Sequence, residues 1–419
     1  MTDSGLRADA RAGATTGFGF IVLLAAMSML LPVSLDVVLP AFPAMAKALH
    51  ASAGMVQWTF SSFLLSFGVG QLITGALSDR HGRRPLLLAG LAIFMAASLA
   101  CALVNDVRLL VLLRFVEGAG ASVGIACMRA IIRDVQHDVD RAASLQAYVQ
   151  TVQTVSIMAA PLIGAGILAL LDWRWIFGFL AAAGAVVAAA VAWYLPETSP
   201  RVSEGILPGY RRVLRLPRTI PLAGFVTFAT GSYFVLLTAS PFILTKHISV
   251  PFALFGVACA MVLGNISAGR LVRRFGARRL AGGGVALILL ACTANCATEL
   301  LRPTPTGFVA TMAMFAFSLG FGMPNIFASA LADAGTDAGA ASGILGSMQM
   351  VGGAATTWIV TALPWRLSTS AGFLVLMGGL TAAASYRWSC MRSRTGGSAG
   401  IMEPVPLALA VSRQPESAD

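Results

Sequence analysis

The segment GALSDRHGRR lies at residues 75–84, and a second copy of its pattern, GRLVRRFGARR, lies at residues 269–279. Both copies are basic, both contain glycine, and both lie between two long apolar runs. A repeated loop at equivalent places in the two halves of a chain indicates an internal duplication. We therefore expect two halves that are built in the same way.

The composition predicts a membrane protein. Hydrophobic residues make up 57% of the chain and charged residues 11%, which is too little polar surface to cover a water-soluble body. A helix needs roughly 20 predominantly apolar residues to cross a bilayer. Twelve runs of about that length are present, at residues 18–40, 56–78, 86–104, 108–132, 143–170, 175–195, 219–245, 252–272, 280–300, 307–332, 339–363 and 370–389. The predicted fold is an all-α membrane protein with twelve transmembrane helices in two six-helix bundles.

The longest polar gap between these runs divides the chain. It covers residues 196–218, and its prolines and arginines interrupt any apolar helix. The predicted organisation has five parts. They are a cytoplasmic amino-terminal tail (1–17), a first six-helix bundle (18–195), a cytoplasmic linker (196–218), a second six-helix bundle (219–390) and a disordered cytoplasmic tail (391–419).

The basic residues predict the orientation and disfavour several classes of partner. Loops on one side carry fourteen arginines, against six lysines and arginines on the other, so both termini should be cytoplasmic. The net charge of +11 is spread over short loops rather than gathered on one face, so we expect no nucleic-acid partner. The six cysteines lack metal-type spacing, and we expect no metal site.

Charged residues inside the predicted spans are few, and such residues are functional by default. Asp36 lies in the first span, and Arg114 and Glu117 lie in the fourth. Their estimated depths in the bilayer make the three near neighbours, and the i, i+3 spacing of Arg114 and Glu117 suits an ion pair. No histidine lies well inside a span, so a proton crossing the membrane would use a carboxylate.

These three residues are therefore candidates for proton coupling. Burial raises the pKa of a carboxyl group and a nearby arginine lowers it. A carboxylate whose contact with an arginine changes with conformation could load and release a proton near neutral pH. The alternative is a static buried ion pair that fixes helix packing.

The first copy of the loop has a pattern of its own. Gly75 permits close helix approach and Gly82 a tight turn, while Arg80 and Arg83 favour the cytoplasmic side. Asp79 is a carboxylate in an otherwise basic loop, which suggests a fixed partner such as the start of the eleventh helix near residues 337–341. The alternative is that these residues only set the topology.

These features resemble the major facilitator superfamily, whose transporters consist of two parallel six-helix halves. The loop at 75–84 resembles that family's loop between helices two and three, and LLRFVEGAGASVG at 112–124 its fourth-helix motif. Two segments, MRAIIRD at 128–134 and DVVLPAFPAM at 36–45, are similar to the Bcr/CflA branch of drug:proton antiporters. The resemblance implies that Asp79 takes part in a latch that holds the outward-open state.

The fifth span adds a proline-glycine motif. SIMAAPLIGAG at 156–166 resembles the segment that is typical of antiporters in this family, and it includes Pro161, Gly164 and Gly166. Small residues replace glycine at three other positions of the motif, which keeps close helix packing possible. Close packing without any role in antiport is the alternative.

Polar residues within the spans are candidates for the substrate cavity. Each either faces the cavity or makes a hydrogen bond to a neighbouring helix. They are Gln71, Gln153, Tyr233, Asn265, Asn325 and Gln349. Two carboxylates against one arginine favour a neutral or cationic solute.

The sequence and the resemblance together predict a proton-coupled exporter of drug-like small molecules in the bacterial inner membrane. The chain is expected to be monomeric and to use the proton gradient rather than a cofactor. No GxxxxGK[ST] segment is present, so we expect neither ATP-driven pumping nor an enzyme. The alternatives are proton-coupled transport of a metabolite, such as a nucleoside, sugar or amino acid, and a membrane receptor or assembly factor that transports nothing.

Overall fold

The structure is a computed structural model, and it describes residues 18–135, 139–197, 207–244, 248–301, 303–362 and 367–395. These residues form α-helices joined by short turns, with no strand among them. The first six long helices are α2 (Phe18–Asp36), α4 (Ala53–His81), α5 (Arg83–Leu103), α6 (Val107–Val135), α7 (Val139–Leu170) and α8 (Arg174–Tyr194). The other six are α10 (Thr219–Leu244), α11 (Val250–Phe275), α12 (Ala277–Leu301), α13 (Pro305–Ala334), α14 (Ala338–Ala362) and α15 (Leu367–Thr395).

The predicted twelve-helix fold is confirmed, because each of the twelve apolar runs coincides with one long helix. Within the described ranges, nine of these helices are long and apolar enough to cross a membrane. Helices α4, α14 and α15 are not among the nine. Helices α4 and α14 are rich in glycine, serine and threonine, and they pack against each other, so they present less surface to lipid.

Short helices complete the chain. After α2 the backbone turns through η1 (Leu39–Ala41) and α3 (Phe42–Ala48). The predicted linker contains the helix α9 (Leu207–Arg215), and the turn η2 (Gly335–Asp337) joins α13 to α14. Helix α15 continues to Thr395, beyond the predicted boundary at residue 390, and the remainder of the predicted tail lies outside the described residues.

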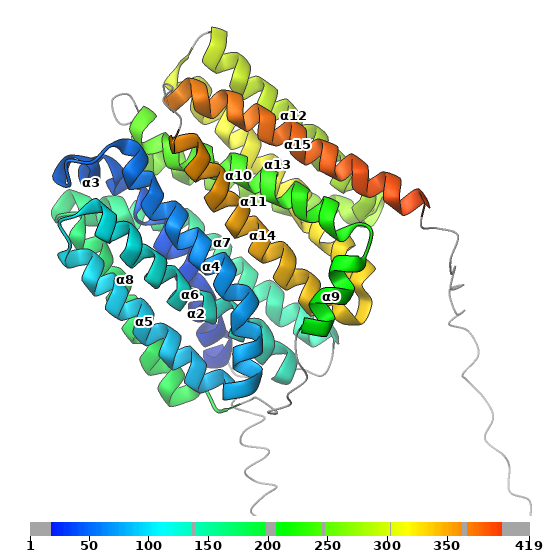
Figure 1. Cartoon of the computed structure of the whole chain (residues 1–419), viewed down its shortest axis with the longest axis horizontal. Helices are drawn as coiled ribbons and strands as arrows, with labels where there is room; N and C mark the ends of the chain where they lie inside the picture. The colour runs from blue at the N-terminus through cyan, green and yellow to red at the C-terminus, as the bar shows by residue number, and fades with distance from the viewer. Residues whose placement is uncertain are drawn as a thin grey trace, which may run out of the picture.

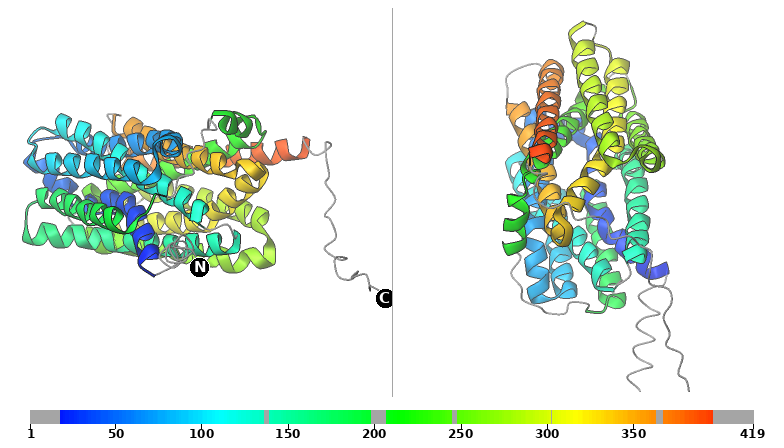
Figure 2. Two further views of the ribbon diagram at one scale, coloured as in Figure 1. Left: turned by 90° about the horizontal axis from the view of Figure 1, so that it is seen from below. Right: turned by 90° about the vertical axis from the view of Figure 1, so that its right-hand side faces the viewer.

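The long helices run along a common direction in two groups (Figures 1 and 2). We call α2 and α4–α8 the first bundle and α10–α15 the second bundle. Within the first bundle α4 and α5 both pack on α6, while in the second α11 and α12 both pack on α13. The bundles meet along a seam between α4 and α14, and α7 also contacts α11. Helices α3 and α9 mark opposite ends of the molecule (Figure 1), which we call the α3 end and the α9 end.

The duplicated loops adopt the same backbone shape at the α9 end. Gly82 ends α4 with φ 96° and ψ 153°, and Gly276 ends α11 with φ 78° and ψ 150°. Each donates its N–H to the carbonyl oxygen four residues earlier, which belongs to Ser78 in the first loop and Val272 in the second. Only glycine adopts this region of φ and ψ readily, so the repeated glycine is required by the turn.

Candidate functional site

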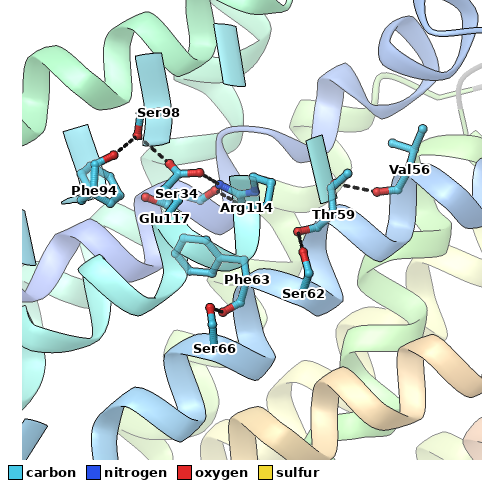
Figure 3. A network of polar contacts seen from close by, with 10 residues as sticks. All are labelled: Ser34, Val56, Thr59, Ser62, Phe63, Ser66, Phe94, Ser98, Arg114 and Glu117. Atoms are coloured by element: carbon cyan, nitrogen blue, oxygen red, sulfur yellow. Dashed lines mark hydrogen bonds and ion pairs between the residues drawn. The ribbon is translucent and has the colours of Figure 1, made fainter. Parts of the chain in front are cut away.

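Arg114 and Glu117 form a buried ion pair inside the first bundle (Figure 3). One guanidinium nitrogen of Arg114 lies 2.7 Å from a Glu117 oxygen, and the two side chains are 1% and 0% exposed. Ser98 on α5 donates to the other Glu117 oxygen at 2.8 Å. Arg114 also donates to the backbone oxygen of Ser34 on α2 at 3.1 Å, and its guanidinium lies 4.4 Å from the centre of the Phe63 ring on α4. The pair thus ties α6 to α2, α4 and α5.

The glycines of the fourth-span motif hold α6 close to its neighbours. A β-carbon at Gly118 would lie 2.4 Å from the backbone oxygen of Phe63 on α4. One at Gly120 would lie 2.7 Å from the backbone oxygen of Gly90 on α5. Small residues allow such close approach of helices within a membrane, and here they place α6 so that Arg114 and Glu117 are fully enclosed.

Asp36 is in a different environment. It is the last residue of α2, is partly buried, and has no hydrogen bond or ion pair with any residue that the structure describes. Its carboxyl group is close enough to Tyr233 of α10 to interact with it electrostatically. Tyr233 stacks on Phe315 of α13 with ring centres 6.3 Å apart and an interplanar angle of 16°. This cluster joins α2 of the first bundle to α10 and α13 of the second.

The structure therefore pairs two of the three predicted coupling residues, Arg114 and Glu117. Arg114 reaches α2 at the Ser34 carbonyl oxygen but makes no hydrogen bond or ion pair with the Asp36 carboxylate. The expectation of one three-residue cluster came from depth along the helix axis, which says nothing about the direction of a side chain. The sequence predicted Tyr233 as one of six candidates for the substrate cavity, and it did not indicate Phe315. No sequence signal pairs either of them with Asp36.

The proline-glycine segment of α7 packs on the chain next to Asp36. A β-carbon at Gly164 would lie 1.9 Å from the backbone oxygen of Val37, so α7 touches the point where α2 ends. Pro161 is buried one turn earlier. Gly166, in contrast, is exposed and has open space around it. Of the three predicted motif residues, Gly164 and Pro161 therefore lie at the contact between α7 and the end of α2, and Gly166 does not.

The predicted latch loop is held mainly within the first bundle. Arg83 is 1% exposed, and its Nε lies 3.1 Å from Asp134 at the end of α6. Glu197, which follows α8, accepts the backbone N–H groups of Arg83 at 2.8 Å and Arg84 at 3.3 Å. A carboxylate at these N–H groups caps α5 and complements its dipole. Glu197 belongs to the LPET segment, and its capping role could not be inferred from sequence.

The remaining latch residues are less fully described. The side chain of Asp79 and the surroundings of Gly75 lie outside what the structure describes. Arg80 is exposed. Asp337, in the region where a partner for Asp79 was expected, binds Arg212 of α9 through two hydrogen bonds of 2.7 and 2.6 Å. These bonds and the charge of Arg212 hold the pKa of Asp337 below its ordinary value.

The six polar candidates fall into different environments. Gln153 donates to the backbone oxygen of Ser28 on α2 at 3.1 Å, and Asn325 to that of Phe321 in its own helix at 2.9 Å, so both side chains bind backbone. Gln71 lies on the seam, with its side-chain oxygen 2.9 Å from the β-carbon position of Gly346 on α14. Asn265 and Gln349 are partly buried, and no contact of theirs ties them to Asp36.

Aromatic and amide side chains close the seam at the α3 end. The indole N–H of Trp58 on α4 donates to Thr361 on α14 at 2.7 Å, and its ring centre lies 6.1 Å from that of Trp358. Gln57 donates to the backbone oxygen of Thr238 on α10 at 3.0 Å. These contacts join the two bundles at the α3 end.

Comparison with known proteins gives a consistent family. Residues 18–357 match the sequence profile of the Major Facilitator Superfamily. An uncharacterised MFS-type transporter of Bacillus subtilis is 30% identical over 362 residues, which is 82% of this chain and 89% of the relative. The bicyclomycin resistance protein homolog of Haemophilus influenzae is 28% identical and covers 91% of this chain and 98% of its own. Multidrug resistance protein D of Escherichia coli is 29% identical over 86% of this chain and 92% of its own.

A solved structure shares the fold. The partially occluded inward-open conformation of the xylose transporter XylE from E. coli superimposes with a TM-score of 0.71. The match covers 88% of this chain and 96% of that protein, at 13% sequence identity. At this identity the likeness concerns the path of the helices and not the solute.

Proposed function

Because this chain belongs to the major facilitator superfamily of transporters, we propose that it exports drug-like small molecules across the bacterial inner membrane in exchange for protons. The mechanism is alternating access, in which the two bundles rock about a central site. The names of its relatives support export, since they include a bicyclomycin resistance protein homolog and a multidrug resistance protein.

The main support for this proposal is the position of Asp36 between the bundles. The carboxyl group is held by no arginine or lysine among the described residues, and the residue it interacts with, Tyr233, belongs to the opposite bundle. When two bundles move relative to each other, a group between them changes its surroundings more than a group inside one of them. Asp36 is therefore the residue that we propose takes up and releases the proton.

Arg114 and Glu117 have a supporting role in this proposal. Their ion pair lies wholly inside the first bundle and moves with it as a unit. Through the bond from Arg114 to the Ser34 carbonyl, it fixes the last turn of α2, which carries Asp36. Gly164 of α7 supports the same region, because it contacts Val37, the residue that follows Asp36. In this proposal the pair positions the proton site.

The chemistry of the central cluster suggests the kind of solute. Tyr233 offers an aromatic ring beside the Asp36 carboxyl group, and the buried rings of Phe315 and Phe234 pack around it. Such a set suits a neutral or cationic compound with apolar or aromatic parts, because ring faces and a carboxylate both attract cations. A proton and a cationic substrate would compete for Asp36, which is the simplest way to couple their opposite movements.

The proposed topology places the α9 end in the cytoplasm and the α3 end outside. The arginine-rich loops at Gly82 and Gly276, together with α9, gather at one end of the molecule. Both termini would then be cytoplasmic.

Everted membrane vesicles test the function as a whole. Vesicles that contain the protein should accumulate several unrelated cationic or neutral drugs when the interior is acidified, and each addition of drug should release protons from the lumen. Vesicles with Asp36→Asn should do neither, and vesicles with Asp106→Asn, which changes an exposed carboxylate at the start of α6, serve as a matched control. Accumulation of one metabolite and of no drug would overturn the drug proposal and favour metabolite transport. Drug accumulation that does not depend on the pH gradient would overturn the proposal of proton coupling.

A further inference from the structure

Helix α9 is fastened to the second bundle. Besides the paired bonds from Arg212 to Asp337, Arg218 just beyond α9 lies 2.6 Å from Asp333 of α13. On the inner face of α9, Val213 is fully buried and packs with Ala341 and Ile344 of α14. Two ion pairs and one apolar contact thus make α9 part of the second bundle, although it lies in the segment between the two bundles.

One side chain of α9 reaches the first bundle. The hydroxyl group of Tyr210 donates to the backbone oxygen of Leu72 on α4 at 3.5 Å. The same ring lies against Gly343 of α14, where a β-carbon would be 3.1 Å from the hydroxyl oxygen and 3.5 Å from a ring carbon. Tyr210 therefore lies across the α4–α14 seam at the α9 end. Partial burial raises the pKa of its hydroxyl group, so the group stays protonated and able to donate.

Tyr210 extends a row of contacts between the bundles on one face of α14. Ser342 accepts a hydrogen bond from Arg129 of α6 at 3.2 Å, Gly343 contacts Tyr210, and Gly346 contacts Gln71 of α4. Residues three and four apart share a helix face, so these contacts lie side by side. When the bundles separate at the α9 end, all of them must break.

We propose that α9 is a clamp, carried by the second bundle, whose residue Tyr210 holds the α4–α14 seam closed at the α9 end. The inference rests on the alternating-access part of the proposed function and on neither the drug nor the proton. The clamp is separate from the loop at residues 75–84, because its residues come from α9, α4 and α14. It favours conformations that are closed at the α9 end and thereby sets the balance between the two faces of the transporter.

The ring of Tyr210 should matter more than its hydroxyl group. A distance of 3.5 Å is long for a hydrogen bond from a hydroxyl, so the bond is weak, whereas the ring fills the space above Gly343. For Tyr210→Ala we expect the ratio of molecules open to molecules closed at the α9 end to rise about tenfold, which corresponds to about 1.4 kcal/mol. For Tyr210→Phe we expect a rise of less than about threefold.

Distances between paired nitroxide labels, measured by pulsed electron resonance in proteoliposomes without substrate or gradient, test this proposal. One pair, at Tyr194 on α8 and Phe275 on α11, spans the bundles at the α9 end. A second pair, at Leu103 on α5 and Leu301 on α12, spans them at the α3 end. All four side chains are exposed, and the labels are introduced after the six native cysteines have been replaced. Tyr210→Ala should populate longer distances in the first pair and shorter ones in the second.

Arg212→Gln and Arg211→Gln form a matched pair of variants on the same helix. Arg212 holds α9 to Asp337, whereas Arg211 lies on the exposed face with no ion pair among the described residues. Arg212→Gln should shift the distances in the same direction as Tyr210→Ala, and Arg211→Gln should leave them unchanged. Unshifted distances in both Tyr210→Ala and Arg212→Gln would overturn the clamp. Because no substrate is present, that outcome would leave the drug and proton proposal standing.

Discussion

Asp36 of α2 and Tyr233 of α10 interact electrostatically although they belong to opposite bundles. Asp36 is the last residue of α2, which ends beside the α7 glycine contact, and Tyr233 is held by its stack on Phe315. Each partner is thus fixed within its own bundle, so relative movement of the bundles changes their separation directly. We propose that conformation and charge are linked at this point.

Replacing Glu117 by glutamine should destabilise the protein without a specific effect on coupling. The change leaves the Arg114 guanidinium fully buried without its counter-ion, which costs about 3–5 kcal/mol when a buried pair is broken. Thermal unfolding in detergent should shift to markedly lower temperature. Asp36→Asn removes no ion pair and should unfold near the wild-type temperature. Equal unfolding temperatures for Glu117→Gln and wild type would contradict a structural role for the pair.

Two glycines of α7 should respond differently to the same change. Gly164→Ala places a methyl group 1.9 Å from the Val37 carbonyl oxygen, which forces α7 away from the end of α2 at a cost of about 1–3 kcal/mol. Gly166→Ala enters open space and should change stability by less than about 0.5 kcal/mol. Drug accumulation in vesicles should fall for the first variant and not for the second. Similar behaviour of the two would show that the Val37 contact has no importance.

The two repeat loops offer another matched comparison. Both Gly82→Ala and Gly276→Ala put a side chain in a glycine-only region, which costs about 1–3 kcal/mol. At Gly82 the added methyl group also lies 2.6 Å from a Glu197 oxygen, whereas nothing lies within 4 Å of it at Gly276. Gly82→Ala should therefore lower the unfolding temperature more than Gly276→Ala. The reverse order would argue against Glu197 as the cap of α5.

The Arg212–Asp337 pair should be insensitive to pH in the physiological range. Arg212 lowers the pKa of Asp337, so the stabilisation is fully present above the ordinary value of 3.8 and is lost as the pH falls through the lowered pKa. The difference in label distances between wild type and Arg212→Gln should stay constant from about pH 5 to 8. A difference that disappears between pH 5 and 7 would mean that another group controls the docking of α9.

The sequence predicted features that depend on local pattern. Twelve helices follow from the length of the apolar runs, since a backbone in lipid must satisfy its own hydrogen bonds. The Arg114–Glu117 pair follows from i, i+3 spacing, and the turn at Gly82 from its repeated glycine. None of these needs knowledge of how the helices are arranged in space.

Contacts between segments distant in the chain could not be predicted in this way. The pairing of Asp36 with Tyr233 depends on how the two bundles dock and on the direction in which each side chain points. The capping of α5 by Glu197 and the contact of Tyr210 with Leu72 depend on the paths of two loops. Depth along a helix axis placed Asp36 at the level of Arg114 but could not show in which direction the Asp36 side chain points.

The assignment of Asp36 as the proton site is tested by comparing two transport modes of Asp36→Asn in proteoliposomes. Exchange of a labelled for an unlabelled neutral drug across the membrane needs the binding site and the movement of the bundles, but neither the Asp36 charge nor net proton transfer. Accumulation against a drug gradient, driven by an imposed pH gradient, needs the proton as well. We predict that Asp36→Asn keeps exchange and loses pH-driven accumulation, while the wild type shows both. Undiminished pH-driven accumulation by Asp36→Asn would contradict the assignment of Asp36 as the proton site.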